Sequence, residues 1–334
     1  MQRVPFETMK SEFTRVLLAS GLAEDRARLC ARVHAENSRD GVYSHGLNSF
    51  PGFVARVREG GGIDIHATPR KVGGFGALEQ WDGESGLGIL NATTCMERAV
   101  ALAREHGIGC VALRNTNHWM RAGTYGLQAA DAGRIGICWT NTTRLMPPHG
   151  SAERRIGNNP LVFAIPREGG HILLDMAISQ FSGGKTLIHS RSGQPFPVPG
   201  GYDSQGNLTC DAAAIRQSNR PLPIGYWKGS GLAMALDLVA ALASGGRTTY
   251  QIALEGGERG VSQTFIAIDI IRIAGEEGLR QVVEETIGDL HTAPPLREGE
   301  PVAYPGERML QRRRENLEKG VPVDSEFWEQ VLAL

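Results

Sequence analysis

Short, nearly continuous apolar runs in the middle of the chain constrain its fold more than any other feature. They occupy residues 108–113, 135–139, 161–165, 172–178 and 264–270 of the 334-residue sequence. Runs of this length are typical of strands that are buried on both faces of a sheet. Helical periodicity separates them at residues 92–106, 123–132 and 231–243. This alternation predicts an α/β fold around a mostly buried sheet.

Both ends of the chain have a helical pattern. Residues 6–36 show apolar positions at helical spacing, and Gly21 divides them into two helices; a third pattern covers residues 50–58. Near the other end, the pattern returns at residues 279–290, 307–319 and 325–332. We therefore expect a helical layer built from both termini and packed on the sheet. The predicted parts are residues 1–66 (helical), 67–274 (α/β) and 275–334 (helical, returning to the first part).

Composition excludes several classes of protein. Lysine and arginine total 35 and aspartate and glutamate 36, so the net charge of −1 provides no basic surface for nucleic acid or an anionic membrane. The longest apolar stretch, residues 232–243, is shorter than the roughly 20 residues that a membrane-spanning helix needs. Five cysteines without a C-x-x-C pair indicate reduced thiols, with neither disulfides nor a structural metal. We expect a soluble, cytoplasmic protein.

The familiar nucleotide-binding motifs are absent. The Rossmann fingerprint G-x-G-x-x-G begins at Gly86, Gly107 and Gly229 but is completed at none of them. Gly184-Lys185-Thr186 resembles the end of a phosphate-binding loop, yet Ser179 occupies the place of its first glycine. A nucleotide site in this chain must therefore be built in another way.

Polar residues gather at four places beside apolar strands or at helix starts. These are residues 43–46 (YSHG), 114–119 (RNTNHW), 139–143 (WTNTT) and 226–231 (YWKGSG). Ligands of open α/β sheets collect at strand ends, and a helix start with a lysine suits an anion. The structural alternative for each cluster is a hydrogen-bonded loop or a helix cap, and the residues alone leave both open.

In these segments the chain resembles a known family. Residues 43–48 (YSHGLN), 79–82 (EQWD), 117–121 (NHWMR), 138–141 (CWTN), 157–161 (GNNPL), 225–231 (GYWKGSG), 262–268 (SQTFIAI) and 305–307 (PGE) closely resemble the malate/L-lactate dehydrogenase-like NAD(P)-dependent oxidoreductases. The resemblance extends from the first helix to the last. It implies a homodimer, a mixed sheet with a non-Rossmann cofactor site, and NADH as cofactor, with NADPH not excluded. It also implies reduction of a small-molecule 2-oxo acid in the α/β part.

The resemblance also implies roles for single residues. His45 matches the family's proton donor, and His118 matches a histidine that serves as acid or base in relatives; Ser44 and Asn117 would orient the substrate or the catalytic ring. The residues that would contact the cofactor are His171, Ile172, Leu173, Leu174, Asp175, Met176, Ala177, Trp227, Lys228, Pro305, Gly306, Glu307 and Thr142. Histidine suits the chemistry because hydride delivery to a ketone leaves an alkoxide, which a nearby imidazolium can protonate.

One position departs from the family pattern. The family usually carries an arginine three places after the glycine of Ser-His-Gly, where it could bind a substrate carboxylate, and this chain has Ser49 there. A serine cannot form the bidentate pair of hydrogen bonds by which a guanidinium binds a carboxylate. Arg121 and Arg144 are the candidate replacements. Otherwise the substrate differs, as in a malate, lactate, sulfolactate or ureidoglycolate dehydrogenase or a cyclic imine reductase. A catalytically silent dinucleotide-binding protein is the alternative from another class.

Overall fold

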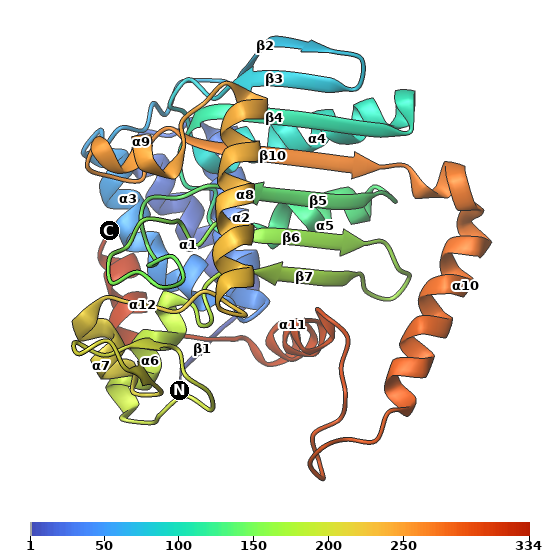
Figure 1. Ribbon diagram of the computed structural model, residues 1–334. Coiled ribbons are helices and arrows are strands. Elements are labelled where there is room, and N and C mark those ends of the chain that lie inside the picture. Colours follow the sequence, from blue (N-terminus) through green and yellow to red (C-terminus); the bar gives the residue numbers. More distant parts are fainter. Residues whose placement is uncertain (1) are drawn as a thin grey trace.

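A seven-stranded mixed sheet forms the centre of the computed structural model, which describes residues 2–334 (Figure 1). The strands lie in the order β2 (Arg70–Phe75), β3 (Leu78–Asp82), β4 (Ile108–Thr116), β10 (Val261–Ile268), β5 (Ile135–Thr140), β6 (Leu161–Ile165) and β7 (Ile172–Met176). β3 and β4 run parallel, whereas the other neighbouring pairs of this sheet are antiparallel. The predicted α/β fold with a mixed sheet is confirmed.

Helices cover both faces of this sheet. α4 (Gly88–His106) and α5 (Gly123–Asp131) pack on one face, where Trp119, Tyr125 and Phe265 are fully buried among smaller apolar side chains. α8 (Trp227–Ser244) crosses the other face (Figure 1). Because both faces are covered, the strands read as continuous apolar runs in the sequence.

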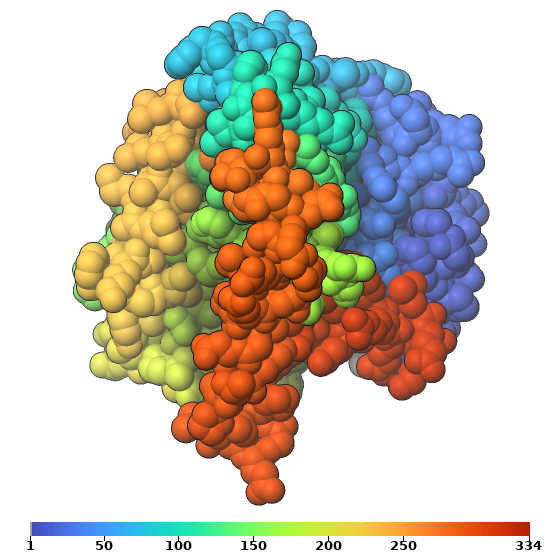
Figure 2. Space-filling view, turned by 90° about the vertical axis from the view of Figure 1, so that its right-hand side faces the viewer, coloured from blue at the N-terminus to red at the C-terminus, as the bar shows by residue number. Residues whose placement is uncertain are grey.

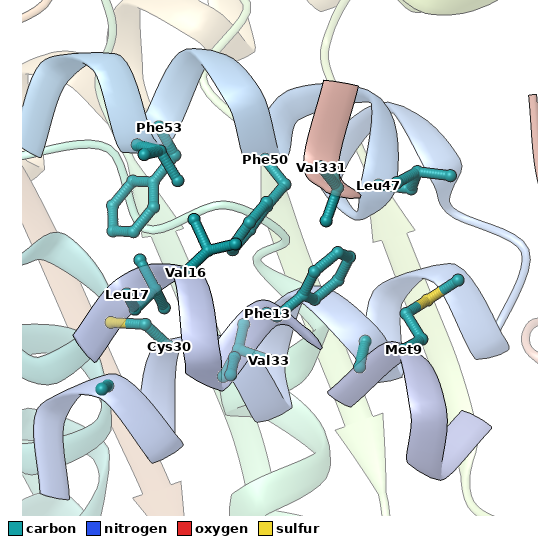
Figure 3. Close-up of a cluster of buried hydrophobic side chains, with 14 of the residues drawn as sticks. Met9, Phe13, Val16, Leu17, Cys30, Val33, Leu47, Phe50, Phe53 and Val331 are labelled. Atoms are coloured by element: carbon teal, nitrogen blue, oxygen red, sulfur yellow. The ribbon is translucent and has the colours of Figure 1, made fainter. Parts of the chain in front are cut away.

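The two chain ends build one helical layer, as expected. It contains α1 (Phe6–Ala19), α2 (Glu24–Arg39), α3 (Phe50–Arg58) and α12 (Ser325–Ala333), and short strands β1 (Arg3–Val4) and β11 (Val321–Pro322) pair antiparallel. Figure 3 shows Val331 of α12 beside the apolar side chains of α1, α2 and α3. The exact boundaries after residues 66 and 274 stay a prediction.

Some elements begin or end elsewhere than predicted. β2 and β3 were not predicted, because neither contains a continuous apolar run. β2 contains two glycines and is mostly exposed. The segment 190–226, which is rich in glycine and proline and shows no long periodic run, begins in the last turn of α6 (Gly183–Ser192). It contains β8 (Gly201–Tyr202), β9 (Leu208–Thr209) and α7 (Ala212–Ser218). α10 (Ile270–Thr292) starts nine residues before the predicted position 279, with an interruption at Gly275. It runs along one side of the molecule (Figure 2).

The remaining helices connect these layers. α9 (Thr249–Leu254) lies between α8 and β10, and α11 (Glu307–Lys319) returns the chain from α10 to the helical layer. Within residues 2–334, no helix is both long and apolar enough to span a bilayer. The same residues contain no group of three His, Cys, Asp or Glu side chains arranged to hold a metal ion.

Candidate active site

Two imidazole rings from different layers face each other. His45 ends the 3-10 turn η1 (Tyr43–His45) of the helical layer, and His118 lies in the loop after β4. Their ring centroids are 5.7 Å apart and their planes are inclined by 12°. The structure thus brings together the two histidines that the sequence placed 73 positions apart.

Hydrogen bonding fixes which nitrogen of His118 carries its proton. The backbone N–H of Met120 donates to His118 Nδ1 over 3.0 Å. In the neutral ring the proton therefore lies on Nε2, so that His118 can donate one hydrogen bond through Nε2 to a ligand. His45 Nδ1 lies 3.1 Å from Ser44 Oγ, which leaves its Nε2 for a reacting group.

Burial makes both rings neutral at physiological pH. Desolvation lowers the pKa of His45 to about 4, assisted by the charges of His118 and Arg121 and opposed by that of Asp175. Desolvation also lowers the pKa of His118 to about 4, assisted by Arg56. An anion bound beside the rings would raise both pKa values, because negative charge favours imidazolium.

The neighbours of these histidines hold them in place. Asn117 Nδ2 donates to the carbonyl oxygens of Gly62, Ser85 and Gly86 at 3.2, 2.8 and 2.9 Å, which ties the His118 loop to the helical layer. Asn37 Nδ2 donates to the carbonyl oxygen of His45 at 2.9 Å. With its amide N–H groups engaged in this way, Asn117 is suited to positioning the His118 loop.

The start of α6 forms a further wall of the site. A Cβ atom added to Gly184 would lie only 3.1 Å from the Cβ of Ser44. Glycine at this position therefore lets the first turn of α6 approach the Ser44–His45 pair closely.

Arg121 is part of a buried ion network. Its guanidinium donates to Asp40 at 2.9 Å and to Asp175 at 3.0 Å, and its side chain is 5% exposed. Asp40 also binds Arg39 and Arg313, and the hydrogen bonds from these arginines, with their charges and that of Arg121, outweigh burial and lower its pKa to about 2. The network joins α2, β7 and α11. It also engages Arg121, so that this side chain would have to leave two carboxylates in order to bind a substrate.

A cavity joins two of the segments expected to hold the cofactor. Leu173 and Asp175 of β7 line a space of about 540 Å³ together with Gly306 at the start of α11. The N–H of Leu173 donates to the carbonyl oxygen of Pro305 over 2.8 Å, which holds the 305–307 segment beside β7 (Figure 1). Gly306 has φ +96°, and a Cβ there would lie 3.0 Å from the Leu173 nitrogen. A glycine that lets the backbone approach closely, beside a cavity at the edge of the sheet, is the kind of place where a dinucleotide can bind.

The other residues expected at the cofactor are spread along β7 and beyond its end. Ile172 and Leu174 belong to β7, and the side chain of Met176 packs in the cluster on the α8 side. Ala177 precedes Ile178, whose carbonyl oxygen accepts from Ile224 N–H at 2.9 Å, and this contact places Trp227 and Lys228 past the end of the strand.

Several of those side chains are occupied by protein contacts. Thr142 is buried and hydrogen-bonded to Asn158 and Asn159. His171 contacts Asp131 at 2.9 Å, and Glu307 accepts from His291 and lines a neighbouring cavity. The structure brings only Leu173, Asp175 and Gly306 of the expected set to the cavity described above.

Neither of the cations proposed to replace the arginine missing at position 49 lies free beside the rings. Arg144 stacks on Tyr250, with its guanidinium carbon 5.2 Å from the ring centroid, and Arg121 is ion-paired. Ser49 itself donates to the carbonyl oxygen of Gly46. Arg56, which belongs to none of the motifs in the sequence, has no ion-pair partner within residues 2–334.

Arg56 occupies the same flank of the helical turn as Ser49. The two positions are seven residues apart. In a helix of about 3.6 residues per turn, seven residues fall about 20° short of two full turns, so the two side chains project from nearly the same side. The N–H of Gly61 donates to the Arg56 carbonyl oxygen at 3.0 Å, and neighbouring Gly62 accepts from Asn117. The charge of Arg56 lowers the pKa values of His118 and His34. The seven-residue spacing from Ser49 was the signal in the sequence that could have identified it.

The known proteins that this chain is similar to are dehydrogenases and reductases. A family model described as malate/L-lactate dehydrogenase matches residues 4–332. The chain is similar to the 2,3-diketo-L-gulonate reductase of Citrobacter koseri, with 44% identity over 99% of this chain and 100% of that protein. The solved sulfolactate dehydrogenase of Methanocaldococcus jannaschii is 29% identical, with a TM-score of 0.90 and coverage of 99% and 95%. Δ1-Piperideine-2-carboxylate reductase of Pseudomonas syringae pvar. tomato is 26% identical, with a TM-score of 0.88 and coverage of 100% and 99%.

Proposed function

The chain belongs to the malate/L-lactate dehydrogenase family, and from this premise we propose that it reduces a 2-oxo acid, with 2,3-diketo-L-gulonate and its reduction to 3-dehydro-L-gulonate as the favoured reaction. Membership makes it an oxidoreductase that uses a nicotinamide dinucleotide. The observation that supports the proposal best is the facing pair of His45 and His118, from two layers of the fold.

His45 is the proposed proton donor. A nicotinamide bound beside the rings would supply a hydride for the carbonyl carbon of the substrate, and the carbonyl oxygen would then need a proton. His45 Nε2 delivers it, while His118 donates a hydrogen bond from Nε2 to the same oxygen or to its neighbour. The low pKa of His45 keeps its ring neutral and ready to act as base in the reverse direction, and an anionic substrate would raise the pKa for reduction.

Arg56 is the proposed partner of the substrate carboxylate. Within residues 2–334 it makes no ion pair, its charge acts on His118, and it occupies the helical flank of the missing arginine. A guanidinium can bind a carboxylate through two parallel hydrogen bonds.

The test is a substrate panel with matched histidine variants. Purified protein is assayed with NADH and with NADPH against 2,3-diketo-L-gulonate, other 2-oxo acids and a cyclic imine, by following nicotinamide absorbance. His45→Gln should lose roughly 10²–10⁴-fold in kcat while it still binds dinucleotide. His66→Gln, a change at an exposed loop position, should leave turnover unchanged.

The panel also separates the alternatives. Preference for malate, sulfolactate or an imine would assign the other chemistry to this site, and the change at Ser49 favours such a difference. Zero turnover on all substrates with intact dinucleotide binding would indicate a silent binding protein. Near-normal turnover in His45→Gln would contradict the assigned proton donor.

A homodimer is the second part of the proposal. Met234, Leu238 and Leu242 follow one another at four-residue spacing on α8 and are 58, 39 and 77% exposed. An apolar stripe of this kind favours burial in an interface. A second copy of the chain is the proposed occupant because the family resemblance implies a homodimer, and α8 also carries Trp227 and Lys228 at its start.

A further inference from the structure

The cavity between β7 and α11 contains two carboxylates and two guanidinium groups. Asp40 and Asp175 provide the acidic groups, and Arg121 and Arg308 provide the basic ones. Gly306, at the N-terminal end of α11, lies between Arg308 and β7. Which of these charges remains available to a ligand decides what the cavity can bind.

Both carboxylates are already neutralised by protein. Asp40 accepts hydrogen bonds from Arg39, Arg121 and Arg313 at 2.7–2.9 Å. Asp175 accepts from Arg121 at 3.0 Å and from the Gly123 N–H at 3.2 Å. Both oxygens of Asp40 are thus engaged. Both bonds to Asp175 end on Oδ2, so its charge is paired with that of Arg121, while its Oδ1 has no hydrogen-bond partner within residues 2–334.

Arg308 is the unpaired charge of this cavity. Within residues 2–334 its guanidinium makes no ion pair and no hydrogen bond. It is exposed on the second residue of α11, directly after the Pro305–Glu307 segment that packs on β7. The cavity therefore presents a free cation to a ligand that lies along β7.

Dinucleotide sites distinguish their two cofactors through this kind of charge. A site for NAD(H) places a carboxylate on the 2′-hydroxyl of the adenosine ribose, whereas a site for NADP(H) places an arginine near the 2′-phosphate. We propose that Arg308 binds the 2′-phosphate of NADPH and that the protein prefers NADPH to NADH. The proposal depends on the proposed function in placing the dinucleotide in this cavity, and it differs from the NADH expected from the sequence.

The pyrophosphate of the cofactor is the other anion that Arg308 could meet, and it is common to both dinucleotides. A bond to the 2′-phosphate affects NADPH alone, whereas a bond to the pyrophosphate affects NADPH and NADH equally. Selectivity, and not the strength of binding, is therefore the decisive measurement.

Binding is measured without substrate, by titrating the wild-type protein with NADPH and NADH and following nicotinamide fluorescence. We expect NADPH to bind at least ~10-fold more tightly, which corresponds to about 1.4 kcal/mol. Competition with 2′,5′-ADP and 5′-AMP locates the preference, since only the first carries the 2′-phosphate. The 2′,5′-ADP should compete at least ~10-fold better.

Four variants test the residue itself. Arg308→Ala should weaken NADPH roughly 10- to 100-fold and leave NADH within about threefold, and Arg308→Glu should reverse the preference. Arg308→Lys keeps the charge and should retain part of the selectivity. Arg314→Ala is the matched control, because Arg314 lies on the same helix but lines a different cavity.

Two results would overturn the inference: equal or tighter binding of NADH by the wild type, or an equal loss of both dinucleotides in Arg308→Ala. Failure of the proposed function gives a different pattern. If no 2-oxo acid is reduced but NADPH is selected through Arg308, the cofactor assignment holds. If substrates are reduced with NADH alone, the cofactor assignment fails and the reaction stands.

Discussion

At the scale of single residues, the proposed site takes several of its polar side chains from one short stretch of the helical layer. Ser44, His45, Ser49 and Arg56 lie within 13 residues, in two 3-10 turns and the helix α3. The three-dimensional arrangement adds His118 from the sheet. We therefore expect that a small number of substitutions in this stretch can change the substrate without changing the fold.

Arg56→Ala should raise the KM for a 2-oxo acid about 10- to 100-fold and change kcat less, because a two-pronged carboxylate contact is lost. Steady-state kinetics with the substrate found in the panel measure both constants. Adding Ser49→Arg to this variant should restore part of the affinity, since it returns a cation to the same helix flank. Arg58→Ala is the control, because Arg58 binds Ser20 and Leu334 instead. An unchanged KM in Arg56→Ala would show that another group binds the carboxylate.

At the scale of elements, the packing of α1, α2 and α3 makes the helical layer sensitive to acid. His34 of α2 is fully buried among Phe13, Phe50 and Phe53. Its Nδ1 bonds to the Cys30 carbonyl oxygen at 2.8 Å, and its Nε2 has no partner. Burial lowers the pKa of His34 to about 4 from 6.5, with smaller contributions from Arg56, His118 and His45.

The sign of the pH effect follows from this difference. Above pH 6.5 the ring is neutral in the folded and the unfolded chain, so titration costs no stability. Between pH 6.5 and 4 the unfolded chain binds the proton and the folded chain does not, so the free energy of unfolding falls as pH falls. His34→Phe should remove this dependence and make the variant about 2 kcal/mol more stable relative to wild type at pH 5 than at pH 7.5.

Denaturant unfolding at the two pH values checks this prediction. His66→Phe, at an exposed position, is the control and should follow the wild type. Because Cys30 O also accepts the backbone N–H of its own helix, losing the ring contact leaves no orphaned carbonyl. A His34→Phe variant with the same pH dependence as wild type would contradict a neutral buried ring.

At the scale of the whole molecule, the exposed stripe on α8 predicts assembly. Leu242→Glu should place a charge in the proposed interface and convert a dimer into a monomer, as measured by light scattering of the eluting protein. Leu18→Glu is the control, since Leu18 is also exposed but lies on α1 of the helical layer. A wild-type protein that elutes as a monomer would rule the dimer out.

The sequence predicted the buried strands well and the exposed ones poorly. Residues 161–165 coincide with β6, and residues 50–58 coincide with α3, because apolar periodicity marks both. β2 and β3 pair at the sheet's edge, where exposed positions carry no such signal. Segment 190–226 was rich in glycine and proline, and its short helix α7 depends on a small local cluster around Phe196 and Ile215.

The candidate site divides in the same way. Motif resemblance identified His45, His118 and the β7 segment, since these side chains were recognisable in the linear sequence. The motifs did not reveal that Arg121 is ion-paired with Asp40 and Asp175. Nor did they reveal that Arg308 makes no ion pair within residues 2–334. Ion pairing depends on residues more than 50 positions apart, and only their distances decide it.

By itself, the sequence determined the family and the mixed α/β architecture, and it singled out the histidines that we propose for proton transfer. These depend on residue types and their order, which periodicity and motifs report directly. Only the tertiary structure decided which charges are neutralised and which remain free for a ligand. The physical reason is that an ion pair forms or fails over a few ångströms, a distance that the fold sets between segments remote in the chain.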